Sequence, residues 1–474
     1  MKQNKEYSLL KNTAIFFLGN FCSKILMLLI IPLYTFYVSV EEMGQYDILH
    51  SYVNLFLPIF CFCLYEGVYR WLLVSKNNDS EIIVTGFTSF LILVIVCNFI
   101  SVIFFQYFEY KYQNYFILYI DSLILYTLTQ FITRGLRNNK LYAIQGILYT
   151  FLFVGLNAYF VMKLKLGISG IVWSAVISNS ISSIMILFKQ KIFSKILFYK
   201  FNFYSNFKLF IDLLKYSLPL VPNSVAWWLV SCSNRLIVNF KLGDQANGVF
   251  SISLHLSTIL TLAASFFYQA WQEQAISGYN ESDRNNYYTK IFNLYVRVLL
   301  FFCLILIPFS KIVILYFMEN SYKESLNYVG ILYISSVFNA LSAFYGTGYL
   351  CKKKTIGSLY TTILGAIANI SVTYLLISFI NLYAAAIGNL IGNFIIWIVR
   401  VFSMKSYFRI AIDWKNLIFL TFINFILIII VNYLTLFESL IVFAFTVLFL
   451  VIYIRDFIKS IFLKIKTQYL PFQN

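Results

Sequence analysis

Charged residues are scarce in this chain, and their scarcity excludes the largest class of proteins. Only 12% of the 474 residues are charged, 60% are hydrophobic, and the mean hydropathy is +0.78. A soluble domain typically carries about twice that share of charge. The apolar runs are continuous and do not alternate with polar residues, which also argues against membrane β-strands. The composition therefore predicts an all-α polytopic membrane protein.

Groups that perform chemistry are also few. The chain has two histidines, and no cluster of carboxylates or loop of domain length falls on the predicted outer side. A glycan polymerase or membrane glycosyltransferase needs positioned acids, bases or metal ligands, so this alternative is disfavoured. The seven cysteines mostly lie inside apolar runs, and the side chains of Cys61 and Cys63 would leave a helix on different faces. We predict no catalytic residue, no metal site, no disulfide and no cofactor.

Charges and turn residues divide the chain into about fourteen transmembrane helices. The expected ranges are 12–37, 46–65, 84–106, 114–133, 141–162, 167–188, 216–240, 246–268, 291–310, 327–350, 356–379, 384–404, 414–435 and 438–454. With both termini in the cytoplasm, 27 of the 36 Lys and Arg residues lie on the inner side and six lie in outer loops, Lys311 among them. The positive-inside rule explains this bias, so the net charge of +17 sets orientation and does not indicate nucleic-acid binding.

A weak internal repeat predicts two lobes. "VSVEEMGQYDILHS" (38–51) resembles "KLGDQANGVFSISL" (241–254), where Gly248-Val-Phe250 matches Gly44-Gln-Tyr46 at an offset of 204. "KLKLGISGIVWSAVIS" (163–178) resembles "SFINLYAAAIGNLIGN" (378–393), in which residues 214 apart correspond. Six helices separate the copies, so a pseudo-two-fold axis along the membrane normal should relate them. We predict a six-helix lobe over 1–200 with a basic inner linker, a second lobe over 201–408, and two additional helices with a basic tail over 409–474.

Cations within predicted helices are the candidate functional residues. The helix over 216–240 carries a polar stripe of Asn223, Trp227, Ser231, Asn234 and Arg235, and the first helix carries Asn20 and Lys24. Both stripes are expected to face the space between the lobes, where Lys24, Arg235 and Arg297 would bind phosphate or glycan. Arg235 and Arg297 could instead extend to the membrane interfaces, whereas Lys24 has no interface near it.

The remaining charged candidates are one acid and one cluster. Asp121 is identified as the only carboxylate well within a helix, either as counter-ion of Lys24 or Arg235 or as part of a coupling-ion site. Glu66, Arg70, Arg134 and Arg137 lie near helix ends and are assigned to the inner mouth, although most such charges only set orientation. A basic, polar slot suits an anionic head group, whose lipid tail could remain in the bilayer.

Longer segments carry a family resemblance. "NTAIFFLGNFCSKILMLLIIPLYTFYVSVEEMGQYD", "KYSLPLVPNSVAWWLVSCSNRLIVNFKLGDQANGVFS", "FFYQAWQE" and "SYKESLNYVGILYISSVFNA", followed by "KKKTIGSLYTTILGAIANISVTYLLI", occur in that order. They resemble the polysaccharide transporters, or oligosaccharide (O-antigen) flippases, of the multidrug/oligosaccharidyl-lipid/polysaccharide exporter superfamily. The resemblance extends over nearly the whole chain, although each motif alone is loose.

This resemblance implies a function. Such proteins have two six-helix lobes around a central cavity and move undecaprenyl-diphosphate-linked glycans to the outer leaflet of the bacterial plasma membrane by alternating access, for O-antigen or capsule synthesis. The implied partners are the anionic lipid-linked glycan, membrane lipid, a polysaccharide polymerase and glycosyltransferases, and a monomer is expected. A cation-coupled drug or metabolite exporter of the same superfamily is the main alternative. It is disfavoured because the predicted cavity is basic.

Overall fold

The computed structural model describes residues 34–74, 79–107, 111–199, 202–277, 283–351, 355–405 and 407–448, together with residues 30, 32 and 279. Within these ranges the regular structure consists of sixteen helices, a helical stretch over 34–37 and the short helix Leu436–Leu448, which agrees with the all-α prediction. Two compact units form, over residues 1–248 and 249–474. The lobe boundaries near 200 and 408 stay a sequence prediction.

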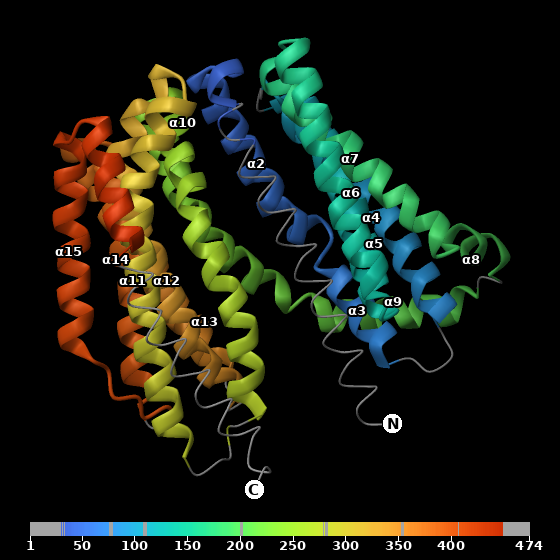
Figure 1. Ribbon diagram of the computed structural model, residues 1–474. Helices are drawn as coiled ribbons and strands as arrows, with labels where there is room; N and C mark the ends of the chain where they lie inside the picture. Colours follow the sequence, from blue (N-terminus) through green and yellow to red (C-terminus); the bar gives the residue numbers. More distant parts are fainter. Residues whose placement is uncertain are drawn as a thin grey trace, which may run out of the picture. The chain divides into compact units, whose positions relative to one another are not determined.

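The first unit holds nine helices that are described in full and the start of a tenth (Figure 1). They are α2 (Val40–Phe60), α3 (Leu64–Val74), α4 (Asp79–Tyr107), α5 (Gln113–Gly135), α6 (Asn139–Asn157), η1 (Ala158–Lys163), α7 (Gly167–Lys189), α8 (Ile192–Phe198) and α9 (Phe203–Ser217), followed by α10 (Leu220–Ser277), which continues into the second unit. The second unit adds α11 (Arg284–Phe317), η2 (Asn320–Ser325), α12 (Leu326–Cys351), α13 (Thr355–Ile380), α14 (Leu382–Ser403) and α15 (Trp414–Tyr433).

The described chain has ten helices that are long and apolar enough to cross a membrane, or eleven if α2 and α3 form one bent span. Three features account for the difference from fourteen. Of the range 12–37, only residues 30, 32 and 34–37 are described. The last predicted helix is described only as Leu436–Leu448, and the ranges 216–240 and 246–268 join in α10. Even so, α10 has one non-helical residue, Gly243, with φ of 86°, where the sequence predicts a turn.

The predicted helix over 46–65 is wrong at both ends. α2 begins six residues earlier, at Val40, and ends at Phe60, and α3 then starts at an angle of 57°. Phe62 and Cys63 adopt left-handed φ values of 46° and 53°, which end the helix. Neither residue is of a type that favours this conformation, so the sequence gives no sign of the break.

The repeat at an offset of 214 has a structural counterpart. In the first unit α7 packs on α5 and α6, and in the second α14 packs on α12 and α13. α7 begins at Gly167 and α14 begins directly after Asn381, 214 residues later, and these two residues have φ of 55° and 50°. Glycine and asparagine are the residues that tolerate the left-handed region best. Both copies therefore have a residue with positive φ where their last helix starts.

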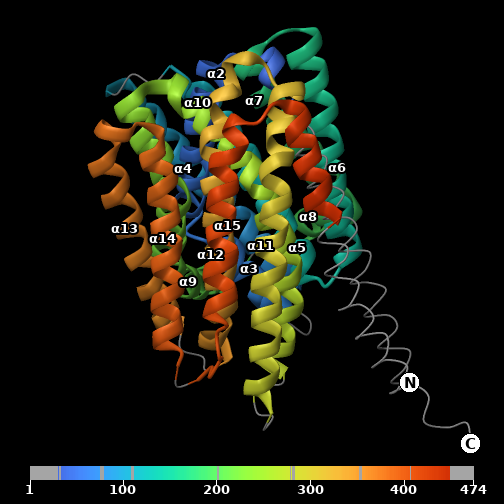
Figure 2. The ribbon, with the colours of Figure 1, turned by 60° about the vertical axis from the view of Figure 1, so that its left-hand side comes forward.

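α15 lies against α11 and α12 within the second unit (Figure 2). Near its middle, the Asn424 amide donates to the Leu300 carbonyl at 3.2 Å. At its end, the buried Lys311 ammonium donates to the carbonyls of Val431 and Leu434. Lys311 was assigned to an outer loop, but it lies within α11 and caps the C-terminus of α15. The additional helix is thus fastened to the second unit by polar contacts along its length.

Arg400 ties three helices of the second unit together. It is 3% exposed on α14, and its guanidinium donates to the Ser342 carbonyl of α12 at 2.8 Å and to the hydroxyls of Ser358, Thr361 and Thr362 of α13 at 3.0–3.3 Å. All four acceptors are neutral. Arginine alone has a planar set of five donors that can reach acceptors on two neighbouring helices at once.

The geometry of the Arg400 donors, beyond their charge, should matter for stability. Lysine keeps the charge but offers one ammonium group, which cannot reach all four acceptors. We expect Arg400→Lys to lower the free energy of unfolding by about 1–3 kcal/mol, because acceptors are left unsatisfied. The measurement is thermal unfolding of the purified protein in detergent, with the exposed Lys405→Arg as the matched control. Equal unfolding temperatures for Arg400→Lys and wild type would contradict this account.

Candidate functional site

Arg235 of α10 faces α2 and forms an ion pair there. Its Nε lies 3.1 Å from Oδ2 of Asp47, and the two side chains are 17% and 3% exposed. A buried carboxylate without a cation nearby is strongly unfavourable in a membrane protein, so the pair holds the two helices in register. The counter-ion of Arg235 is therefore Asp47 and not Asp121.

The start of α2 explains why Asp47 is buried in this helix. Ser39 accepts a hydrogen bond from the Glu42 amide, and the Glu42 carboxylate accepts one from the Ser39 amide. This reciprocal capping box fixes the start of α2 at Val40 and places Asp47 in the second or third turn. The prediction that Asp121 is the only carboxylate well within a helix is wrong for this reason. The Ser-x-x-Glu spacing was the available signal for the earlier helix start.

Polar groups next to Asp47 continue the contact between α2 and α10. The Trp228 indole of α10 donates to the Ser51 carbonyl at 2.7 Å. His50, one position earlier, lies 2.9 Å from the Tyr119 hydroxyl of α5. Asp47, His50 and Ser51 are three to four residues apart, so they share one side of α2. This side joins α2 to both α5 and α10.

α2 and α10 also cross at two glycines, with no room for a side chain between them. A Cβ atom on Gly44 would lie 1.9 Å from the Asp244 carbonyl oxygen, and one on Gly248 would lie 2.0 Å from the Val40 carbonyl oxygen. Gly44 corresponds to Gly248, and Val40 corresponds to Asp244, at the offset of 204 that the sequence repeat predicts. The two helix starts thus meet through equivalent residues. The Asn247 amide closes the contact by donating to the Gly44 carbonyl at 3.0 Å.

The other residues of the predicted stripe have mixed positions. On α10, Asn223 is exposed and Asn234 is buried. Trp227 and Ser231 lie on the same helix, but their side chains are not among those described. Lys24 and Asn20 lie outside the described residues. Only Arg235 among these candidates has a described charged partner, and the assignment of the others to a cavity stays a prediction.

Asp121 has an amide partner. It is partly buried on α5, and its Oδ2 accepts from the Asn98 side chain of α4 at 2.8 Å. Among the described residues no cation lies within ion-pair distance of Asp121. This environment leaves the coupling-ion hypothesis open, while the hypothesis of a pair with Arg235 is wrong.

The four inner-mouth residues come together around α3. Arg134 of α5 lies over the Tyr69 ring at 4.9 Å, and Arg70 lies over the Tyr216 ring of α9 at 4.6 Å. Arg137 donates to the Leu73 carbonyl at 3.1 Å, and Glu66 is close enough to Arg134 for electrostatic attraction. The cluster therefore joins α3, α5 and α9 mainly through cation–π contacts.

Arg297 pairs with an acid near the N-terminus of α15. Its Nη2 lies 2.7 Å from Oδ2 of Asp413, and both side chains are about one third exposed. The pKa of Asp413 is lowered, first by the hydrogen bond from the Asn416 side chain and then by Arg297. Arg297 is thus occupied at the joint of α11 and α15.

The lowered pKa of Asp413 predicts a pH dependence of stability. Its stabilising contribution is present above the pKa of an unfolded aspartate, about 4, and is lost as pH falls through the lower folded pKa. Because the pair is partly exposed, we expect at most about 1 kcal/mol. Asp413→Asn keeps a capping side chain but removes the charge. Unfolding temperatures from pH 7 to pH 3 should show a gap between wild type and Asp413→Asn that closes below about pH 4, and a gap that is constant with pH would contradict the assignment.

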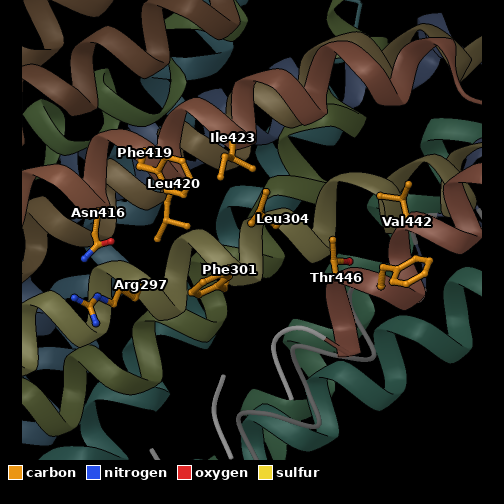
Figure 3. A pocket seen from close by; sticks show the side chains of 10 residues that line it. Arg297, Phe301, Leu304, Asn416, Phe419, Leu420, Ile423, Val442 and Thr446 are labelled. Atoms are coloured by element: carbon orange, nitrogen blue, oxygen red, sulfur yellow. The ribbon is translucent and has the colours of Figure 1, made fainter. Parts of the chain in front are cut away.

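An apolar groove begins beside this ion pair (Figure 3). It has a volume of about 600 Å³ and lies between α11, α15 and the helix Leu436–Leu448. Phe301, Leu304, Leu420 and Ile423 are among its lining residues, and Arg297 is the one charged residue among those described there. A groove of this kind fits a hydrocarbon chain with a polar group at one end.

Comparison with family models assigns the chain to a known family. The model of the polysaccharide biosynthesis protein family matches residues 9–272, more than half of the chain. The chain belongs to the polysaccharide biosynthesis protein family. A search of curated proteins finds no match. The family assignment agrees with the resemblance seen in the sequence.

Solved structures extend the comparison beyond the family segment. The fold is similar to that of the lipid II flippase MurJ in an inward closed conformation, with 15% identity, a TM-score of 0.71 and coverage of 94% of this chain and 100% of that chain. It is also similar to an inward-facing multidrug resistance MATE family transporter of the MOP superfamily, with 15% identity, a TM-score of 0.58 and coverage of 81% and 98%. This family member therefore has the fold that these MurJ and MATE structures share.

Proposed function

We propose that the protein is a flippase for undecaprenyl-diphosphate-linked oligosaccharides. It moves them from the inner to the outer leaflet of a bacterial plasma membrane by alternating access, in the assembly of a surface polysaccharide such as O-antigen or capsule. Membership in the polysaccharide biosynthesis family supports this proposal, as does the similarity to MurJ, which is itself a lipid II flippase.

The observation that carries the proposal is which donors of the Arg235 guanidinium are used by described residues. Asp47 contacts its Nε, and the nearest described partner of Nη1 is the weakly accepting Cys232 sulfur at 4.0 Å. The guanidinium therefore keeps donors for a further anion. Arginine binds phosphate through two parallel hydrogen bonds, and a diphosphate carries more charge than one carboxylate. The substrate head group can therefore displace Asp47 from Arg235, and Asp47 can return when the substrate leaves.

The groove of Figure 3 supplies a place for the lipid part of the substrate. Seven of its ten described lining residues are apolar, and α15 and the helix after it form one wall. An isoprenoid tail can lie in such a groove while the glycan crosses through a polar region. The two C-terminal helices then hold the tail.

Several finer features belong to the same proposal. They are fourteen membrane crossings, cytoplasmic termini, a lobe over 1–200, a lobe over 201–408 and additional helices over 409–474. Lys24, Asn20 and the polar stripe of α10 line the cavity between the lobes. A polymerase and glycosyltransferases act before and after transport, and the protein works as a monomer.

Asp47 bears on the drug-exporter alternative. A cation-coupled exporter needs an acid that is available for protons or cations. Asp47 lies on a candidate span, but Arg235 neutralises it. Asp47 is therefore not such an acid, and this alternative would have to use Asp121, whose described partner is the Asn98 amide.

Deletion of the gene followed by lipid analysis tests the proposal. Loss of a flippase should leave completed lipid-linked glycan in the inner leaflet, inaccessible to a membrane-impermeant glycosidase added to intact spheroplasts. The glycosidase should reach the glycan after complementation with the wild-type gene. Accumulation of single glycan units that the glycosidase can already reach would mean that a later step is lost, and the proposal would be wrong.

A further inference from the structure

A second cavity in the second unit shares no lining residue with the groove of Figure 3. It has a volume of about 920 Å³ and lies where α14 ends and the chain leads into α15. Residues 401, 402, 405, 408–412 and 414 line it, together with Tyr345 of α12. Because α14 and α15 are both candidate spans, the cavity is at the level where the chain leaves the membrane.

The floor and one wall of this cavity are firmly held. Phe408 is 1% exposed and packs on the Tyr288 ring, with centroids 5.0 Å apart. The Ala411 amide donates to the Thr289 hydroxyl at 3.1 Å, and its carbonyl accepts from the Asn293 amide at 2.8 Å. The Asp413 amide donates to the same Asn293 side chain at 2.9 Å. The extended segment before α15 is thus fixed to α11, so the cavity is preformed.

Two cations lie at the cavity with no described partner. Lys405 and Arg409 are both exposed, and neither forms an ion pair or a side-chain hydrogen bond with the described residues. None of the described residues that line the cavity is acidic. The nearby Asp413 is held by Arg297 and Asn416. The local charge is therefore positive and suits an anion.

The remaining walls are apolar. Phe402 is 68% exposed and Trp414 is 44% exposed, and both line the cavity. Tryptophan prefers the membrane interface, and lysine and arginine in that zone attract lipid phosphates at about 1 kcal/mol per charge. The described lining contains no Asn, Gln, Ser or Thr side chain, so a glycan would find few hydrogen-bond partners. The ligand that fits is an anion with hydrocarbon chains and a small head group.

We propose that this cavity is a binding site for an anionic phospholipid, separate from the transport pathway. Lys405 and Arg409 bind its phosphate, and its acyl chains lie along Phe402 and Trp414. The positive-inside prediction places the lipid in the inner leaflet. The site links the anionic lipid of the membrane to the joint between α14 and α15.

Lipid binding to the purified full-length protein tests the site. We compare dioleoyl phosphatidylglycerol with dioleoyl phosphatidylcholine by native mass spectrometry and by thermal shift in detergent. Lys405→Gln/Arg409→Gln is expected to weaken phosphatidylglycerol binding at least tenfold and to leave phosphatidylcholine binding unchanged. The control is Lys290→Gln/Lys415→Gln, which removes the same charge from two exposed lysines that do not line the cavity. It should change either affinity by less than twofold.

Three outcomes would overturn the proposal. They are equal loss of phosphatidylglycerol binding in the two double variants, equal binding of the two lipids to the wild type, and tighter binding of farnesyl diphosphate than of phosphatidylglycerol at this cavity. The last would assign the cavity to an isoprenoid substrate. If the double variant does not fold, Lys405→Gln and Arg409→Gln are measured singly. A threefold loss of phosphatidylglycerol affinity is expected in each, and no loss in either would reject the site.

Discussion

Arg235→Gln is expected to reduce glycan export at least about thirtyfold, and the double variant Asp47→Asn/Arg235→Gln is expected not to restore it. Breaking a buried pair by removing one partner costs about 3–5 kcal/mol, because the remaining charge is uncompensated. The single substitution therefore affects both stability and transport. Neutralising both residues also removes the uncompensated charge of Asp47 and leaves two amide side chains that can form a hydrogen bond. A residue needed only for stability would then recover its function, whereas a phosphate ligand would not.

The measurements are surface polysaccharide and the amount of protein in the membrane. A charge-assisted hydrogen bond contributes about 2–3 kcal/mol, which corresponds to roughly 30–150-fold in binding. Arg284→Gln is the control, because that arginine donates to the Tyr279 carbonyl at the start of α11. It should export at wild-type level. Full export by the double variant would limit Arg235 to a structural role, and the phosphate assignment would be abandoned.

The position of Asp47 within a helix could have been read from the sequence, but its pairing with Arg235 could not. The capping box of Ser39 and Glu42 marks the start of α2 and places Asp47 within a helix. Nothing in the sequence shows which of the acids meets Arg235, because that depends on how α10 crosses α2. The crossing is set by the two glycines, whose match at an offset of 204 was visible but whose contact was not.

The helices themselves were largely predictable, because continuous apolar runs interrupted by charges leave little choice of boundary. α7 was expected over 167–188 and is found over Gly167–Lys189, and α13 was expected over 356–379 and is found over Thr355–Ile380. The break at Phe62 and Cys63 and the partners of Arg400 escaped prediction for one common reason. Both depend on packing between helices, which hydropathy does not record.

Gly44→Ala and Gly248→Ala should each destabilise the contact between α2 and α10 by about 2–3 kcal/mol. A new Cβ would lie within 2.0 Å of a carbonyl oxygen of the other helix, so one backbone must move by about 1 Å to reach ordinary contact. Asp47 lies three residues after Gly44 on α2, so that movement also shifts Asp47 relative to Arg235 of α10. Export should therefore fall together with stability.

The two glycines make equivalent contacts across one crossing, so their effects should not add. Once the first methyl group has moved the helices apart, the second needs little further movement, and the double variant should cost at least about 1 kcal/mol less than the sum of the single variants. Thermal unfolding and export are measured for the wild type, the two single variants and the double variant.

Gly146→Ala and Gly155→Ala on α6 are matched controls, since a Cβ at either position meets nothing within 4 Å. In a helix such a change is neutral or stabilising by up to about 1 kcal/mol. Additive costs, or single variants as stable as the α6 controls, would show that α2 and α10 do not depend on this crossing.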